Sequence, residues 1–311
     1  MKMDFKQALE SDLIRNIRRI PKSDLHDHAL LGARRSVLGK MLGIRFGGFS
    51  AKTGTIGDVN GWIAEQFRPV FDHPGAFGKA VEAAFHQARS DGITLLEMSM
   101  DVMFGRLFKV PPEKVIATLK QAHGKIAPHI EFRPELGMSR SLPVRTLFSC
   151  IEPFLDSGFF RSVDLYDDEF AQPVENFREL YRHFRRCGLK LKAHAGEFGD
   201  AASVRHAAEV LELDAIQHGI AAAASPEVMK WIADAKIQLN ICPESNIRLK
   251  RVASYSAHPI RILFDHGVKV TVNSDDVLLF NTGVSEQFLK LYRCGLFSAG
   301  ELEVIRQNGL S

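Results

Sequence analysis

The sequence has few of the features that mark secreted or membrane-bound proteins. Its four cysteines, Cys150, Cys187, Cys242 and Cys294, are widely spaced and form no Cys-x-x-Cys pair. In a chain of this length they indicate reduced, mostly buried thiols in a reducing compartment. No apolar run reaches the length of a signal-peptide core or a membrane span. We therefore predict a cytoplasmic protein with no membrane partner.

The sequence also lacks an excess of one charge, since 40 basic and 37 acidic residues give a formal net charge of +3. Proteins that bind nucleic acid usually carry a basic patch or stripe. We therefore expect a small-molecule substrate and no nucleic-acid partner. The oligomeric state stays open at this point, including a homo-oligomer.

No low-complexity tract, internal repeat or linker rich in Gly, Ser or Pro divides the chain. The composition, 45% hydrophobic and 25% charged residues, is that of an ordinary globular protein. We therefore predict a single domain over residues 1–311. A glycine-rich phosphate loop after the first predicted strand is also missing, which disfavours a doubly wound open sheet.

Short strand-like segments alternate with amphipathic helical segments, which predicts parallel strands joined by crossovers. Eight such units fit an α/β fold of the (β/α)8 TIM barrel type, whose catalytic groups lie at the carboxyl ends of the strands. The glycine-containing segment Ile44–Phe71 follows the first strand and is predicted to be an insertion or lid over the site. The predicted strands are Ser23–His28, Ile93–Met100, Glu131–Gly137, Ser162–Tyr166, Lys190–His194, Ala215–His218, Ile237–Ile241 and Lys269–Asn273.

Two histidines at the end of the first predicted strand have the spacing of a metal-binding pair. His26 and His28 are two residues apart, and side chains at that spacing point to the same face of a strand. A pair of polar residues near a turn is the plainer interpretation. Their position at the end of a barrel strand favours metal binding.

Three other predicted strands end in residues of the same chemical kinds. His194 is followed by Glu197 after a tight Ala-Gly turn, which offers a ligand and a proton-transfer group. His218 ends the sixth strand, and taken alone it could equally be a hydrogen-bonded rim residue. Asp275 and Asp276 end the eighth strand, where adjacent carboxylates repel each other unless a cation or a shared proton relieves them.

Six motifs in chain order resemble the adenosine deaminase family of the amidohydrolase superfamily, from about Pro21 to Asn281. The similar motifs are Pro21-Lys-Ser-Asp-Leu-His-Asp-His28, Asp164-Leu-Tyr-Asp-Asp-Glu169, His194-Ala-Gly-Glu197, His218-Gly219, Cys242-Pro-Glu-Ser-Asn246 and Asn273-Ser-Asp-Asp276.

The resemblance implies one divalent metal ion, with zinc preferred, in a (β/α)8 barrel. Its implied ligands are His26, His28, His194 and Asp275. It implies catalytic roles for Glu197, His218 and Asp276. Binuclear relatives usually carry a carboxylated lysine at the fourth strand, and the motif that ends at Glu169 has no lysine.

The implied reaction is the hydrolytic deamination of a 6-aminopurine. Zinc would make hydroxide available near neutral pH. His218 and Asp276 would orient and help to deprotonate the attacking water, and a protonated Glu197 would donate to purine N1. The family favours adenosine, converted to inosine and ammonia, as the first expectation.

Three positions are candidate substrate-binding residues. Leu31 lies in an apolar stretch where the family has an acidic residue that holds the ribose 5′-hydroxyl. Asp167 stands where the family has a glycine, and Gly196 lies within the fifth motif. These departures leave adenine, a 5′-modified adenosine or an aminated pterin as alternative substrates.

Two other classes of function compete with a deaminase. An amidohydrolase that opens a cyclic amide could use the same metal site. A zinc-containing binding protein would need only the ligands, so the presence of Glu197, His218 and Asp276 disfavours it. Zinc deaminases of nucleic-acid bases carry a Pro-Cys-x-x-Cys signature, which this sequence lacks.

Overall fold

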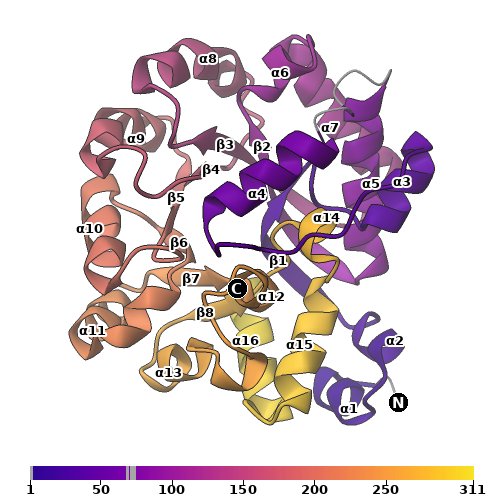
Figure 1. The fold of residues 1–311 in the computed structure, drawn as a ribbon, viewed down its shortest axis with the longest axis vertical. Helices are drawn as coiled ribbons and strands as arrows, with labels where there is room; N and C mark the ends of the chain where they lie inside the picture. The colour runs from indigo at the N-terminus through magenta and orange to yellow at the C-terminus, as the bar shows by residue number, and fades with distance from the viewer. Residues whose placement is uncertain (1–2, 68–69, 71–74) are drawn as a thin grey trace.

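The computed structural model describes residues 3–67, 70 and 75–311 and shows eight parallel strands arranged as a barrel (Figure 1). Each strand pairs with the next one along the chain, and helices connect them on the outside. The predicted (β/α)8 TIM barrel is confirmed. The strands are β1 (Lys22–His28), β2 (Ile93–Asp101), β3 (Glu131–Ser139), β4 (Ser162–Tyr166), β5 (Lys190–Ala195), β6 (Ala215–His218), β7 (Gln238–Ile241) and β8 (Val270–Val272).

Several helices begin where the sequence provides a cap. The Ser225 hydroxyl accepts from a backbone N–H of the first turn of α11, and Pro226 occupies the first helical position. Ser298 and Glu301 form the predicted capping box of α16. The helices are α1 (Phe5–Glu10), α2 (Ile14–Ile17), α3 (Arg35–Leu42), α4 (Ile56–Trp62), α5 (Ala76–Ser90), α6 (Phe104–Leu107), α7 (Pro112–Ile126), α8 (Val144–Asp156), α9 (Arg178–Arg186), α10 (Ala201–Leu211), α11 (Pro226–Asp234), α12 (Pro243–Arg248), α13 (Ile260–Asp265), α14 (Val277–Phe280), α15 (Val284–Arg293) and α16 (Ala299–Leu310), with the π-helical turn η1 (Ile63–Phe67) and the 3-10 turns η3 (Val174–Phe177), η4 (Ile220–Ala224) and η5 (Tyr255–Ala257).

The barrel is nearly closed, and the seam between β8 and β1 is bridged mainly by individual hydrogen bonds. The Asp275 N–H donates to the His26 carbonyl at 2.9 Å, beside one isolated parallel bridge. The Leu25 N–H donates to the side-chain oxygen of Asn273 at 2.8 Å, where a regular ladder would use a carbonyl. These contacts bring the first and last strands together, so residues about 250 positions apart in sequence meet at one rim.

The barrel interior contains a buried charged layer beneath the rim. Lys192 is fully buried, and its ammonium group lies 2.7 Å from Glu97 Oε2 and forms an ion pair with Glu135. Burial raises the pKa of Glu135 to about 7 despite the neighbouring Lys192. The Ser162 hydroxyl also donates to Glu135, at 2.7 Å. Each of these charged side chains therefore has partners, as a buried charge requires.

The segment after β1 covers one side of the barrel mouth. The predicted lid Ile44–Phe71 contains α4 and η1, while its positions 68, 69 and 71 lie outside the described residues. Helix α4 crosses in front of the strands (Figure 1). The Arg248 guanidinium donates to the Phe49 carbonyl at 2.7 Å, and Lys250 donates to the Lys52 carbonyl at 3.0 Å. These two bonds tie the start of the segment to the end of α12 and the residues that follow it.

Within the described ranges, no helix combines the length and the apolar character needed to span a bilayer.

Candidate metal and active site

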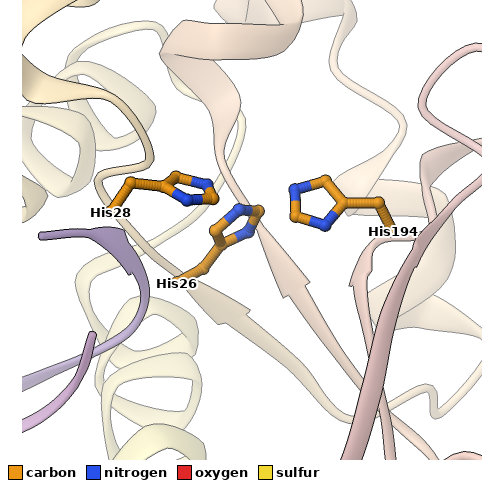
Figure 2. Close-up of side chains that lie close together, drawn as sticks. All are labelled: His26, His28 and His194. Atoms are coloured by element: carbon orange, nitrogen blue, oxygen red, sulfur yellow. The ribbon is translucent and has the colours of Figure 1, made fainter. Parts of the chain in front are cut away.

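Three histidines from two strands converge at the carboxyl end of the barrel. Figure 2 shows His26 and His28, from β1, turned toward His194, from β5. One ring nitrogen of each lies within 4.8 Å of a ring nitrogen of the other two. The ring centroids of His26 and His194 are 4.7 Å apart. Three imidazoles at such distances form the kind of ligand set that zinc and related ions prefer.

Asp275 and His218 complete this cluster from the opposite side. Asp275 Oδ1 lies 3.6 Å from His28 Nε2 and 3.9 Å from His26 Nε2. Its other oxygen lies 3.8 Å from His218 Nε2. Asp275 and His218 both have a positive φ, near 60°, which is uncommon for residues other than glycine. Strained backbone of this kind clusters at functional sites, where the surrounding structure holds it in place.

The protonation states of the cluster fit a cation at its centre. Burial, and then the neighbouring imidazoles of His194 and His218, lower the pKa of His26 well below its usual range. His26 is therefore neutral, and its buried Nε2 has no hydrogen-bond partner among the described residues. Burial opposes protonation of His194 as well, but Asp164 raises its pKa to about 9. A divalent cation would satisfy both rings, because it binds neutral imidazoles and replaces the His194 proton.

Two of these imidazoles are oriented by contacts to the ring nitrogen that faces away from the cluster. Asp164 Oδ1 lies 3.2 Å from His194 Nδ1, which leaves the other ring nitrogen free to face the cluster. The Cys242 sulfur lies 3.3 Å from His26 Nδ1. Burial raises the pKa of the Cys242 thiol well above its usual range, so it stays neutral and acts as a hydrogen-bond partner. Contacts to the second nitrogen of a ligating histidine fix its tautomer and orientation.

The turn after β5 is held so that Glu197 faces the cluster. Glu169, which follows β4, accepts hydrogen bonds from three successive N–H groups, those of Gly196, Glu197 and Phe198, at 2.7 to 2.9 Å. Gly196 has φ near +69°, and a side chain there would meet Val204 at 2.2 Å. The glycine is therefore required by both conformation and space.

Glu197 lies in a buried pocket of hydrogen-bond donors. Its Oε1 is 3.4 Å from both the Ser245 hydroxyl and the Asn246 amide nitrogen, and its Oε2 is 3.5 Å from His218 Nε2. Burial, and then the charge of Asp275, raise the pKa of Glu197 to about 8. The carboxyl group therefore holds a proton at neutral pH, as a general acid requires.

Asp276 is the second carboxyl group with a strongly altered affinity for protons. Burial and the charge of Asp275 raise its pKa well above its usual range. Its Oδ1 is buried and has no hydrogen-bond partner among the described residues. Unpaired buried groups of this kind are costly, and they mark places where a ligand or water completes the structure.

A cavity of about 130 Å³ is lined by part of this cluster, including His194, Glu197 and Asp276. Of the three substrate-binding candidates, Leu31 and Asp167 line it, while Gly196 is absent from the described lining and its N–H is bonded to Glu169. The lining residues are His28, Leu31, Ile56, Val59, Asn60, Ile63, Tyr166, Asp167, His194, Glu197, His218, Ser245, Leu249, Asp275, Asp276 and Phe280.

Comparison with known proteins gives the relationship directly. Residues 65–311 match the family model described as adenosine deaminase. The chain belongs to the adenosine deaminase family. It is thus an aminohydrolase of the class that acts on cyclic amidines, as the motifs predicted. A Treponema pallidum protein provisionally named adenosine/adenine deaminase is 31% identical over 285 residues, covering 92% of this chain and 95% of that protein.

A second relative by sequence and a solved structure of similar fold extend the comparison. The adenine deaminase of Zymomonas mobilis is 33% identical over 240 residues, covering 73% of this chain and 69% of that protein. The crystal structure of an amidohydrolase from Burkholderia ambifaria with bound zinc superposes with a TM-score of 0.79 at 19% identity. It covers 100% of this chain and 88% of that structure. The fold is therefore shared well beyond the range of close sequence similarity.

Four residues at the site had no role in the prediction from sequence. Asp164, Glu169, Cys242 and Asn246 all fall inside the six motifs, but their contacts cross from one strand end to another. Their position inside the motifs was the one indication in the sequence that these four residues belong to the site. The partner that each one contacts could not be read from spacing along the chain.

Proposed function

We propose that this protein is a zinc-dependent hydrolytic deaminase of a 6-aminopurine, with adenine as its substrate. The observation that supports the reaction most strongly is the position of the buried Glu197 carboxyl group beside a cluster of three imidazoles and Asp275. A general acid next to a metal-type ligand set is what removal of an amino group as ammonia requires. We also propose that residues 1–311 form one domain, since the eight strands belong to one sheet.

We assign the metal to four ligands, His26, His28, His194 and Asp275. Two observations support this assignment. His26 Nε2 has no hydrogen-bond partner among the described residues, and Asp164 beside His194 favours a positive charge at that ring. The zinc bound by the structurally similar Burkholderia protein favours zinc over other divalent ions. When bound, the ion supplies a Lewis acid that makes hydroxide available near neutral pH.

The remaining polar residues carry the proton transfers. His218 and Asp276 would orient the attacking water and accept its proton, because both reach the cavity and a cation at the cluster would favour the ionised form of Asp276. Glu197 would donate its proton to N1 of the purine as hydroxide adds at C6. The proton taken from water then passes to the amino group, the C6 hydroxyl returns its proton to Glu197 as the carbonyl forms, and the carbon–nitrogen bond breaks to release ammonia.

The cavity favours adenine over adenosine, which was the first expectation from sequence. Its 130 Å³ is below the roughly 300 Å³ at which pockets for larger ligands begin. Away from the metal cluster the lining is mainly apolar, with no acidic residue at Leu31, where the family would hold a ribose hydroxyl. The adenine deaminase of Zymomonas mobilis among the relatives supports the same choice.

Ammonia release from a panel of compounds tests this proposal. The purified protein, loaded with zinc and assayed for metal content, should deaminate adenine faster than adenosine, 5′-modified adenosines and aminated pterins. The Glu197→Gln variant should bind zinc normally and release ammonia orders of magnitude more slowly than wild type. Turnover of a cyclic amide without deamination would replace the proposal with the rival amidohydrolase reaction, and faster turnover of adenosine would overturn the choice of substrate.

A further inference from the structure

Asp167 combines backbone strain with a position on the cavity wall. It follows β4 directly and has φ near +81°, a region that residues with a side chain seldom adopt. Such a conformation is costly in energy and persists where the surroundings impose it. Asp167 also lines the cavity described above. The chain is therefore held in a costly conformation at the point where the Asp167 carboxylate reaches the cavity wall.

Two side chains fix this carboxylate from either side. The Ser139 hydroxyl donates to Asp167 Oδ2 at 2.5 Å, and the Asn60 amide donates to Oδ1 at 3.1 Å. Asn60 belongs to α4, so this second bond links the helix that covers the mouth to the end of β4. A carboxylate offers about four acceptor positions. Asp167 therefore keeps acceptor capacity for a donor on a bound ligand.

Asp167 differs from the other polar groups of the cavity wall. The Tyr166 hydroxyl donates to Asp101, and the Ser245 hydroxyl is directed to Glu197. Apart from these groups and Asn60, the described lining away from the metal cluster is apolar: Leu31, Ile56, Val59, Ile63, Leu249 and Phe280. A ligand that reaches across the cavity from the metal cluster toward α4 therefore meets an anionic acceptor, and a donor on the ligand would satisfy it.

We propose that Asp167 selects the free base by accepting the N–H of the five-membered ring of adenine. This inference rests on the proposed deaminase function and names the residue that distinguishes substrates. Adenine carries an N9–H, whereas in adenosine the same nitrogen is bonded to the sugar and offers no proton. Asn60 of α4 is bonded to Asp167 at this point, so a sugar on N9 would have to displace that contact. A site that binds a substrate N–H discriminates against an analogue that lacks it, because the analogue loses that hydrogen bond and places a substituent against the half-buried Asp167 carboxylate instead.

The test uses 9-methyladenine, which removes the N9–H and adds no sugar. The wild-type enzyme should prefer adenine over 9-methyladenine in kcat/KM by at least about 100-fold. The Asp167→Gly variant removes the carboxylate and also relieves the positive φ, so its thermal stability should stay equal or rise. Its preference for adenine should fall at least tenfold. The Asp168→Asn variant changes the neighbouring carboxylate, which lies outside the described lining, and should keep the wild-type preference.

Two results would overturn the inference. The first is an Asp167→Gly variant that keeps the wild-type preference for adenine over 9-methyladenine. The second is a variant that loses activity on adenosine alone, because the carboxylate would then hold the sugar. Calorimetric binding of both bases to the Glu197→Gln variant separates this inference from the proposed reaction. If wild type releases no ammonia but adenine still binds more tightly than 9-methyladenine, the reaction fails and the role of Asp167 stands; equal or absent binding of the two bases overturns it.

Discussion

The barrel interior contains two buried polar layers that differ in how completely they are paired. In the lower layer, Lys192 lies between Glu97 and Glu135, and each charge has a partner. In the rim layer, His26 Nε2 and Asp276 Oδ1 are equally buried but have no partner among the described residues. Burial of a polar group without a partner is costly in either place. The lower layer is therefore complete within the protein, whereas the rim layer requires a ligand.

Each layer also contains a carboxyl group with a raised pKa, but the two groups differ in what they contact. Burial raises the pKa of Glu135 to about 7 and that of Glu197 to about 8. Glu135 contacts other protein groups, whereas Glu197 faces the cavity. An altered pKa therefore indicates function only where the group reaches a site that a substrate can enter. Substitutions that affect one layer and spare the other test this distinction.

The largest expected effect comes from comparing the two glutamates. Glu197→Gln keeps the shape but removes the proton donor, so kcat should fall by about 10² to 10⁴-fold. Glu135→Gln keeps the size and shape of a side chain that is absent from the described cavity lining, so kcat should stay within about twofold of wild type. Steady-state ammonia release, normalised to folded protein by circular dichroism, measures both. Equal losses of activity in the two variants would show that the layers do not differ in function.

The lower layer should dominate stability. Lys192→Met leaves two buried carboxyl groups without their cation, and loss of one partner of a buried ion pair costs about 3 to 5 kcal/mol. Unfolding in urea, followed by circular dichroism, gives this value. The exposed Lys230, paired with Asp234 on the surface, provides the control. Lys230→Met should change the free energy of unfolding by less than about 1 kcal/mol. Similar values for the two variants would contradict the comparison.

Metal removal should weaken the rim layer. Zinc at 100 times its dissociation constant adds about 2.7 kcal/mol to the free energy of unfolding, so chelation should lower the melting temperature and added zinc should restore it. The His26→Ala variant should lose this response, whereas His206→Ala, which changes an exposed histidine bonded to Glu175, should keep it. A melting temperature that is insensitive to chelation in wild type would contradict the proposed metal site.

The smallest effect is the pH dependence of turnover. The pKa of Glu197 is raised to about 8, so the protonated donor is present below that pH and lost above it. On the alkaline side kcat should fall about tenfold per pH unit. A cation beside Glu197 favours its ionised form, so this decline should begin at or below pH 8. A rate that stays constant up to pH 10 would exclude Glu197 as the proton donor.

Much of this arrangement could be predicted because strand ends in a barrel share one rim. The predicted ranges of β4 and β6 agree with the structure, five other strands differ by one or two residues at one end, and β8 is one residue shorter at each end. His26, His194 and Asp275 therefore meet although their positions in sequence are far apart. Alternation of strands and helices is a local property of the sequence, which is why it could be recognised without the structure.

The contacts between neighbouring strand ends could not be predicted in the same way. Asp164 meets His194 and Glu169 holds the turn of Glu197 because β4 and β5 are adjacent and end at the same height. That height depends on register, which the sequence of either strand alone does not determine. The positive φ of Asp167 was not predicted either, because aspartate seldom adopts this region of backbone conformation.

Helix α4 has unequal attachments on its two sides. The chain before it is bonded to Arg248 and Lys250, whereas on the opposite side Asn60 makes a single hydrogen bond to Asp167. Movement of α4 away from the end of β4 would therefore break one amide-to-carboxylate bond, that of Asn60 to Asp167.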